Sequence, residues 1–284
     1  MLYSFLAITI LLSLCVTLVF SGDLLTFWLL LELCSIVVIP CFYWNDNISA
    51  LSQVDGLLYY LLATSISSSL ILVGILFPGI FFFFFFGFFL KFGVFPFIFW
   101  VYQVFTSSKS WIICWCISTV LKFPVLYISF FVGQFNISLA IFLSSLGILI
   151  SGVLVWVNSI NWFAVWCYMM VSSSNVIVCL SVDCSFFNLL IVYLVYFIWS
   201  SGVIFYLSSF YGGVFGYVVW LIAIPLSFAL YYKIYVSYLL IGLGWVFVFF
   251  WVLYSFLEQF YLFKWLVSST IPKSTWWGRG KILF

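Results

Sequence analysis

The sequence contains no histidine and very few charged residues. Lys, Arg, Asp and Glu together make up 5% of the 284 residues, whereas a soluble domain carries about 25%. The absence of histidine excludes haem ligation by histidine, histidine-containing zinc sites and a histidine proton relay. The scarcity of charge excludes a water-facing surface over most of the chain. With a net charge of +2, there is also no basic field for nucleic acid.

Motifs for redox cofactors are also missing. There is no G-x-G-x-x-G dinucleotide fingerprint, no CxxC pair and no cysteine spacing typical of iron–sulfur clusters. The eight cysteines mostly fall inside apolar runs, so we expect them to be buried thiols. They are Cys15, Cys34, Cys41, Cys114, Cys116, Cys167, Cys179 and Cys184. We expect no metal or organic cofactor in this chain.

Hydrophobic residues dominate what remains. They make up 68% of the chain and form continuous runs of roughly 20 residues, the length a helix needs to cross a bilayer. A transmembrane barrel would alternate apolar and polar residues instead. We therefore predict an all-α polytopic membrane protein with about ten transmembrane helices, two of them discontinuous.

Hydropathy and charged breaks place these spans along the chain. The predicted ranges are 3–20, 24–43, 52–77, 79–104, 110–132, 137–157, 163–182, 186–209, 215–240 and 242–263. Residues 1–263 would form the bundle, and 264–284 a basic C-terminal tail with four basic residues and no acid. The positive-inside rule puts that tail on the matrix (cytoplasm-equivalent) face. The N-terminus reads as a first span rather than a signal peptide or transit peptide.

Most charged residues lie at the ends of the predicted spans. An interfacial anchor is a sufficient explanation for five of them: Asp23, Asp46, Asp55, Lys109 and Asp183. Glu258 lies in the last turns of the final span. We interpret Glu258 as structural, reaching the interface or pairing locally with Lys264.

Four ionisable residues lie well inside predicted spans: Glu32, Lys91, Lys122 and Lys233. An ionisable group at the centre of a membrane helix costs about 2.5–3.5 kcal/mol. One such lysine could snorkel to the headgroups, but four groups doing so is a poorer explanation. We expect all four to face the bundle interior.

Burial of these groups would permit proton chemistry. Removal from water lowers the pKa of a lysine in general, and a nearby carboxylate raises it again. A buried lysine beside a carboxylate can therefore bind and release a proton near neutral pH. The residues alone thus predict an intramembrane proton or cation path.

Glycine and prolines accompany the lysines. Gly93 and Pro96 follow Lys91, Pro124 follows Lys122, and Pro225 precedes Lys233. Proline lacks an amide hydrogen and clashes with the preceding turn, which interrupts a helix. Proline is tolerated in membrane helices. For the Lys91 span we nevertheless predict a discontinuous helix whose freed backbone groups line a hydrated cavity.

These motifs resemble those of a known family. The stretches WLLLELCSIVVIP (28–40), LKFGVFPFIFWVYQVF (90–105), STVLKFPVLY (118–127) and IPLSFALYYKIY (224–235) are similar, in order and spacing, to the motifs of the antiporter-like subunits of respiratory complex I, in the subunit 2 group. The resemblance covers most of the chain. Its short N-terminal part resembles the animal mitochondrial form, which lacks three helices of its bacterial counterpart.

The resemblance implies roles for the four buried residues. Glu32 and Lys91 would form an ion pair that modulates the path, Lys122 would be the central proton relay, and Lys233 would exchange protons with the outlet or a neighbouring subunit. It also implies a proton-translocating membrane-arm subunit of NADH:ubiquinone reductase in the mitochondrial inner membrane. The flavin, the iron–sulfur clusters and the sites for NADH and ubiquinone would lie in other subunits.

The sequence also departs from the family pattern. Ile98 stands where the family has histidine, and Pro225 and Ala229 replace a richer proline–glycine pattern. We also expect the last helix of the family, beyond residue 263, to be missing. The 38 phenylalanines suggest T-biased codons, as in the mitochondria of flatworms or nematodes. Two other hypotheses stay open: a structural spacer that has lost proton transfer, and a free-standing cation/proton antiporter. A native gel would separate the antiporter from both complex-bound alternatives.

Overall fold

The computed structural model describes residues 2–43, 50–77, 79, 82–128, 137–210, 213–225 and 227–270. Over these ranges the chain forms α-helices and short 3-10 helices, with no strand. This confirms the all-α polytopic class. Asp46 and residues 271–284 lie outside the described ranges, as does most of the predicted basic tail.

Seven of the predicted spans form long helices. They are α1 (Leu2–Val19), α2 (Leu24–Val37) with its 3-10 extension η1 (Ile39–Tyr43), α3 (Ala50–Leu76), α8 (Ile137–Val157), α9 (Trp162–Asp183), α10 (Phe186–Ser209) and α13 (Trp245–Thr270). The last helix continues past the predicted limit at residue 263, so Lys264 belongs to α13. The Lys264 ammonium lies over the Trp156 ring, 5.3 Å from its centre.

Three further spans are interrupted within the described residues, one more than predicted. Their pieces are α4 (Phe82–Phe92) with α5 (Phe99–Ser108), α6 (Trp111–Ser118) with the 3-10 helix η3 (Val120–Lys122) and α7 (Val125–Ile128), and α11 (Gly213–Trp220) with α12 (Phe228–Leu243). Each interruption contains one of the prolines noted in the sequence. Helix breaks therefore occur at all three positions where proline accompanies a buried lysine.

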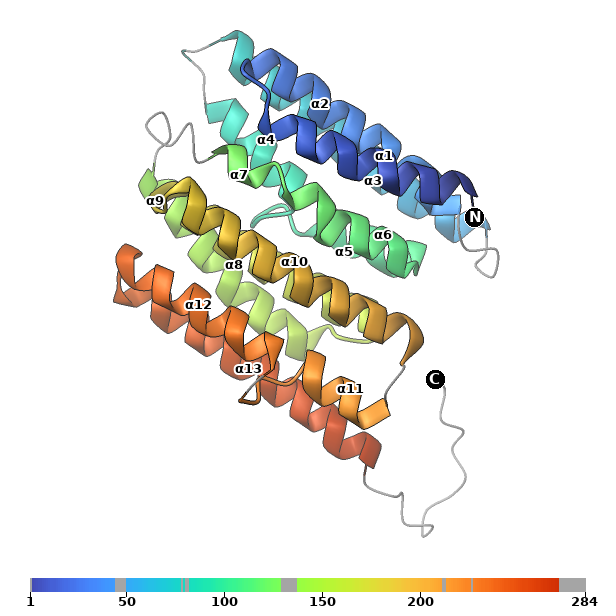
Figure 1. Cartoon of the computed structure of the whole chain (residues 1–284), viewed down its shortest axis with the longest axis vertical. Helices are drawn as coiled ribbons and strands as arrows, with labels where there is room; N and C mark the ends of the chain where they lie inside the picture. Colours follow the sequence, from blue (N-terminus) through green and yellow to red (C-terminus); the bar gives the residue numbers. More distant parts are fainter. Residues whose placement is uncertain are drawn as a thin grey trace.

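The helices run side by side in a bundle that follows the order of the sequence (Figure 1). The first helices lie along one side, α5 to α7 come next, α9 and α10 follow, and α11 to α13 close the opposite side. Among the described residues, six helices are long and apolar enough to cross a membrane. The described apolar part of α1, Phe5–Val19, falls below that length. The spans broken by proline do so because each is divided into shorter apolar pieces.

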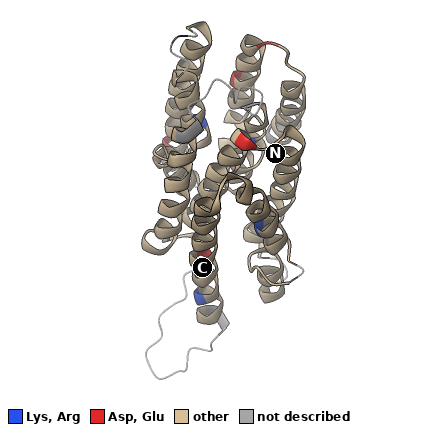
Figure 2. Ribbon diagram, turned by 90° about the vertical axis from the view of Figure 1, so that its left-hand side faces the viewer, with Lys and Arg blue, Asp and Glu red and all other residues tan. Residues whose placement is uncertain are grey.

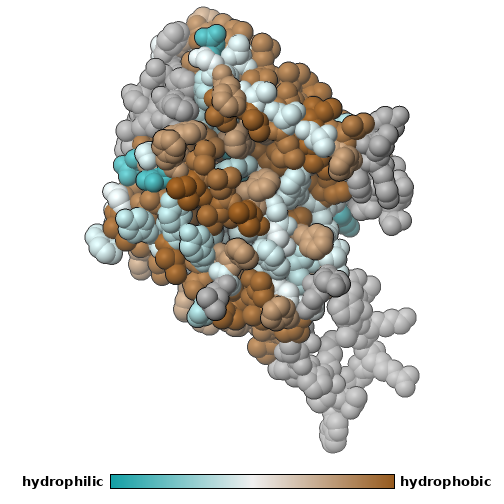
Figure 3. All heavy atoms as spheres, viewed as in Figure 1, coloured by the Kyte–Doolittle hydropathy of each residue, from teal (hydrophilic) through white to brown (hydrophobic). Residues whose placement is uncertain are grey.

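The outside of the bundle is strongly hydrophobic. Large apolar side chains are widely exposed, among them Phe20, Phe187 and Phe215, each at least 76% exposed. Figure 3 shows hydrophobic residues over most of the face it presents. In water such a surface would promote aggregation, so this pattern fits a lateral surface that faces lipid.

Helix α9 is the centre of the bundle. Nearly all of its side chains are buried, including three serines and Asn175 in the run 172–175. It packs against α5, α7, α8, α10 and α12. Serine in a membrane helix allows close packing and hydrogen-bonds within the helix or across to a neighbour, so α9 can carry polar atoms at the centre without exposing them to lipid.

Candidate functional site

The first buried charge pair joins α2 to the end of α4. Lys91 Nζ donates to Glu32 Oε1 at 3.2 Å and approaches the Leu31 carbonyl oxygen at 3.4 Å. The side chains are 6% and 24% exposed, respectively. Lys91 occupies the last turn of α4, where a positive charge is favoured by the helix dipole. The structure thus contains the ion pair that the family resemblance implied.

The helix break after Lys91 is stabilised by a glycine turn and by a side-chain hydrogen bond. Gly93 has φ +63°, a conformation that glycine adopts at little cost. The Trp100 indole donates to the Leu90 carbonyl oxygen at 2.8 Å. Ile98 is buried just before α5. The predicted discontinuity is present, with an indole capping a carbonyl that we expected to face water.

Lys122 is the most deeply buried lysine of the described chain. Its side chain reaches α9 and α10, where Nζ donates to the Met170 carbonyl oxygen at 2.9 Å, to Ser173 Oγ at 2.8 Å and to the Tyr196 hydroxyl at 2.9 Å. An ammonium has three donors, so these neutral acceptors accommodate all of them. Among the described residues, no carboxylate forms a salt bridge with Lys122.

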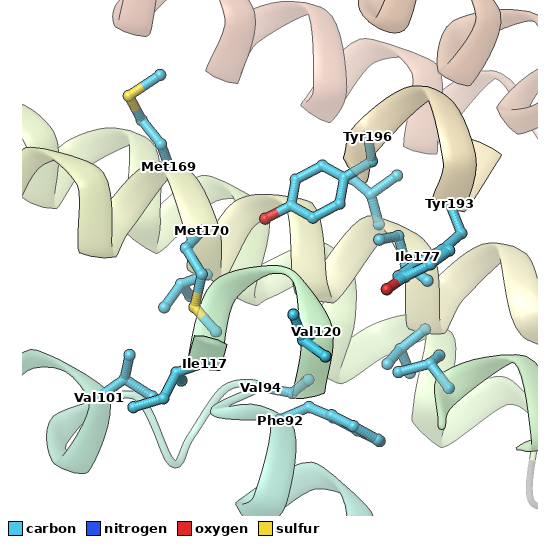
Figure 4. Packing of buried hydrophobic residues seen from close by; sticks show 14 of the residues in the cluster. Phe92, Val94, Val101, Ile117, Val120, Met169, Met170, Ile177, Tyr193 and Tyr196 are labelled. Carbon is cyan, nitrogen blue, oxygen red and sulfur yellow. The ribbon is translucent and has the colours of Figure 1, made fainter. Parts of the chain in front are cut away.

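Two tyrosines of α10 cap the break beside Lys122. The hydroxyl of Tyr196 donates to the Ser118 carbonyl oxygen at 2.8 Å, and that of Tyr193 to the Thr119 carbonyl oxygen at 2.9 Å. Figure 4 shows both rings projecting from α10 into the core of the bundle. Carbonyls freed by the broken helix are costly to bury without a donor. These tyrosines therefore stabilise the break and, through Tyr196, also hold Lys122.

A small cavity lies between Lys91 and Lys122. Tyr60, Thr64 and Met170 are among the other residues that line it. Its space for the centre of a water molecule is about 10 Å³, the lower limit for holding one water. The two lysines thus border a common gap large enough for one bridging water.

A second buried ion pair joins α12 to α13. Lys233 Nζ lies 3.0 Å from Glu258 Oε2, and their side chains are 9% and 3% exposed. The place and partner expected for Glu258 were wrong: it is buried and pairs with Lys233 instead of Lys264. Glu258 and Lys264 are six positions apart, which places them on different faces of a helix, since side chains three or four apart meet. The packing of α12 on α13 brings Lys233 opposite Glu258 instead.

The third break is also capped by a residue of α13. The Gln259 side chain accepts from the Ala223 amide at 3.0 Å and donates to the Leu221 carbonyl oxygen at 3.4 Å. Ser227 Oγ then accepts from the Leu230 amide at 3.2 Å and caps the start of α12. Lys233 follows in the second turn of this helix. The break thus positions the helix that carries the second ion pair.

Of the four residues predicted to face the interior, Lys91, Lys122 and Lys233 are largely enclosed, whereas the Glu32 side chain is 24% exposed and lines an open groove between α2 and α3. Figure 2 shows the few acidic and basic residues as isolated patches on an otherwise uncharged bundle. Direct contacts join only Glu32 to Lys91 and Lys233 to Glu258 among the described acids and bases. Glu258, Tyr193, Tyr196 and Gln259 were missed because their roles come from packing between distant segments. The described residues contain no group of three or more Cys, Asp or Glu suited to a metal ion.

Comparison with known proteins gives no family assignment. No protein-family model matches this chain, and no curated protein matches it. The arrangement itself defines a polytopic membrane protein with two buried acid–lysine pairs on either side of a buried lysine that has neutral partners.

Proposed function

We propose that this chain is a proton-translocating, antiporter-like membrane subunit of respiratory complex I, of the subunit 2 group, in the mitochondrial inner membrane. The observation that carries this proposal is the line of buried ionisable residues across an apolar bundle. Glu32 of α2 and Lys91 of α4, then Lys122 of η3, then Lys233 of α12 and Glu258 of α13 belong to elements that follow one another from one side of the bundle to the other (Figure 1). Buried charges in membranes are costly and typically serve transport.

The two ion pairs at the ends of this line can change the proton affinity of Lys122 at its centre. Charges interact over long distances where the effective dielectric constant is low. Lys122 has only neutral acceptors, so its proton affinity depends on the charges of the flanking pairs. Opening the Glu32–Lys91 pair leaves Lys91 positive without a counter-charge and favours release of a proton from Lys122. Closing the pair favours loading of Lys122.

The cavity supplies a route for loading. A water in this gap would donate to Lys122 only in its neutral form, because the charged ammonium already gives its three donors to Met170, Ser173 and Tyr196. In the proposed complex, electron transfer from NADH to ubiquinone would take place on flavin and iron–sulfur clusters of other subunits. This chain would respond to that chemistry through its contacts with other membrane-arm subunits.

The test is replacement of Lys122 by methionine, which is uncharged and of similar length. The Lys122→Met change is made at the equivalent position of a genetically tractable complex, and NADH-driven proton pumping and quinone reduction are measured together. We expect the complex to assemble on a native gel but to lose proton pumping and coupled turnover. The matched control is Lys264→Met, because Lys264 lies against Trp156 away from the line.

A second candidate function is a structural spacer of the membrane arm. The observation in its favour is that, at all three helix breaks, a side chain hydrogen-bonds to a backbone group that the break leaves unpaired. Such hydrogen bonds make the breaks rigid, as a scaffold requires. The same experiment separates the two functions. Wild-type pumping by an assembled Lys122→Met complex would contradict the proton relay and favour the spacer.

A further inference from the structure

A groove runs along the outside of the bundle between α2 and α3. Its volume is about 540 Å³, far larger than the gap between Lys91 and Lys122. The α3 side of the groove extends from Val54 to Ser68, and this stretch of helix spans about 21 Å. The hydrocarbon core of a bilayer is about 30 Å thick. The groove therefore follows most of the depth of the membrane.

Two hydrogen bonds between α2 and α3 hold the groove in shape. The Tyr60 hydroxyl of α3 donates to the Ser35 carbonyl oxygen of α2 at 2.9 Å. In the opposite direction, the Trp28 indole of α2 donates to the Ser68 carbonyl oxygen of α3 at 3.2 Å. Both serines line the groove. Each bond ties a side chain of one helix to the backbone of the other, so the separation of the two helices is fixed by the fold itself.

Most of the lining is apolar or small. Ile36, Leu58 and Leu62 line the groove and are each at least 50% exposed. The hydroxyls of Ser65 and Ser68 donate to carbonyl oxygens of their own helix, at 3.1 and 2.9 Å, so they need no partner in the groove. Small residues of this kind let a second helix approach closely within a membrane. The groove thus has the lining of a helix-packing surface.

The Glu32 carboxylate gives the groove a specific chemical demand. It lines the groove, is 24% exposed and lies midway along the span Leu24–Tyr43. Its Oε1 accepts from Lys91 at 3.2 Å, and no other donor among the described residues contacts this carboxylate. A carboxylate facing hydrocarbon is costly. Since Lys91 already balances its charge, the group that fits the exposed side is a neutral hydrogen-bond donor rather than a second cation.

We propose that the groove between α2 and α3 is the docking site for a transmembrane helix of another subunit, which presents a hydroxyl or amide side chain to Glu32. A lipid acyl chain would fill the apolar part of the groove but has no donor at the depth of Glu32. A helix supplies both an apolar surface and a polar side chain at mid-span. This inference rests on the proposed function and adds the surface through which another subunit acts: its donor competes with Lys91 for the carboxylate.

The experiment places the photo-crosslinking amino acid benzoyl-phenylalanine at the position of Leu61 in the assembled complex. Leu61 lines the groove and is 43% exposed. After irradiation, the adduct is identified by mass spectrometry. We expect a crosslink to a transmembrane helix of another subunit that carries Ser, Thr, Asn or Gln at mid-span. Lipid adducts alone, a crosslink to a second copy of this chain, or a crosslink to a helix without such a side chain would overturn the inference.

Two tryptophan variants, each combined with the crosslinker, test whether the groove itself holds the partner. Ser65→Trp fills the groove. Ser13→Trp is the matched control, because Ser13 is an exposed serine of α1 whose hydroxyl also bonds within its own helix, at 2.8 Å. We expect Ser65→Trp to reduce the yield of the adduct at least about tenfold, because overpacking weakens a contact, and Ser13→Trp to leave it unchanged. Equal yields in the two variants would contradict docking in the groove.

The crosslink is measured without any reading of proton pumping, so the two proposals fail in different ways. Normal pumping by Lys122→Met would refute the proposed function and leave the docked helix in place. Loss of the expected crosslink, with pumping still dependent on Lys122, would refute the docking site alone. The crosslink from Leu61 decides this even where Ser65→Trp does not assemble.

Discussion

At the residue scale, the interior of this bundle distinguishes two kinds of buried charge. Glu32 with Lys91 and Lys233 with Glu258 balance each other in pairs. Lys122 has no such partner among the described residues and depends on three neutral acceptors. An ion pair keeps both groups ionised, whereas neutral acceptors also tolerate an uncharged amine. Lys122 is therefore the lysine best suited to change its protonation state.

Replacing Tyr196 by phenylalanine tests this view. The Tyr196 hydroxyl accepts from Lys122 and donates to the Ser118 carbonyl oxygen. Tyr196→Phe leaves both groups short of one hydrogen bond in a buried region, which costs about 1–3 kcal/mol of stability. We expect a lower unfolding temperature in detergent, measured by the fluorescence of a thiol-independent dye or by calorimetry.

The control for this prediction is Tyr231→Phe. Tyr231 is 59% exposed, and loss of its hydroxyl leaves no buried group unpaired. Equal unfolding temperatures for the two variants would show that the Tyr196 hydroxyl does not hold Lys122 and the break together.

The sequence predicted buried residues from the free-energy cost of placing a charged side chain in the membrane. Glu32, Lys91, Lys122 and Lys233 could be assigned to the interior because a charge in mid-span is expensive anywhere else. Glu258 lies near the end of a predicted span, where exposure costs little, so the same reasoning gave no reason to bury it. Its partner is 25 residues earlier in the chain, and only the packing of α12 on α13 brings the two together.

At the scale of helices, the three interruptions follow a common design. In each, proline ends a helix, and a side chain from elsewhere caps a carbonyl that the break releases: Trp100, Tyr196 and Gln259. Backbone groups within a bilayer must be satisfied inside the protein. Such caps allow the helix to stop in mid-membrane without exposing its polar ends to lipid.

The turn between α4 and α5 should be sensitive to glycine replacement. Gly93 has φ +63°, and an added Cβ would overlap a methyl group of Val101. The left-handed conformation alone costs an alanine about 1–2 kcal/mol, and the overlap adds to that. We expect Gly93→Ala to lower the unfolding temperature in detergent and to disturb the adjoining Lys91.

Gly22→Ala is the matched control for that variant. An added Cβ at Gly22 meets no atom within 4 Å. Comparable losses of stability in Gly22→Ala and Gly93→Ala would contradict the assigned role of the turn.

The positions of the breaks could be predicted from the sequence, and their caps could not. Proline disrupts a helix through its own ring and missing amide hydrogen. The effect of Pro96, Pro124 and Pro225 therefore acts on their own segments and can be predicted from the sequence. A cap such as Gln259 is 36 residues from the amide that it accepts from. Its function depends on which helices become neighbours. Pro124 was among the proline positions noted in the sequence, but only two discontinuous spans were predicted and the structure has three.

At the scale of the whole molecule, polarity is inverted relative to a soluble protein. Apolar side chains cover the outside, while lysines, acids, serines and tyrosines meet inside. Buried thiols complete this interior: seven of the eight cysteines are buried, as expected from their apolar surroundings, and Cys184 alone is partly exposed. Cys184 lies in the turn between α9 and α10, which makes it a natural reporter of membrane orientation.

Cys184 should be the cysteine that a membrane-impermeant maleimide labels, and only from one face. Seven spans precede its turn, so it lies on the face opposite the N-terminus. With the orientation predicted from the basic C-terminal residues, that is the intermembrane side. Burial, together with the neighbouring Asp183 carboxylate, raises the pKa of the Cys184 thiol to about 11. Since the thiolate is the reactive form, labelling should accelerate about tenfold per pH unit between pH 7 and 9.

The control for labelling is Cys184→Ser, which should remove the signal at every pH. Labelling that persists in this variant would mean that a cysteine assigned to the core reaches water, and the packing around α9 would then be wrong. Labelling confined to the matrix face would instead leave the fold intact and reverse its orientation. A reversed orientation would exchange the inlet and outlet sides of the proposed proton path. The order of Lys91, Lys122 and Lys233 would stay the same, because it follows from helix packing and not from the direction in which the bundle is inserted.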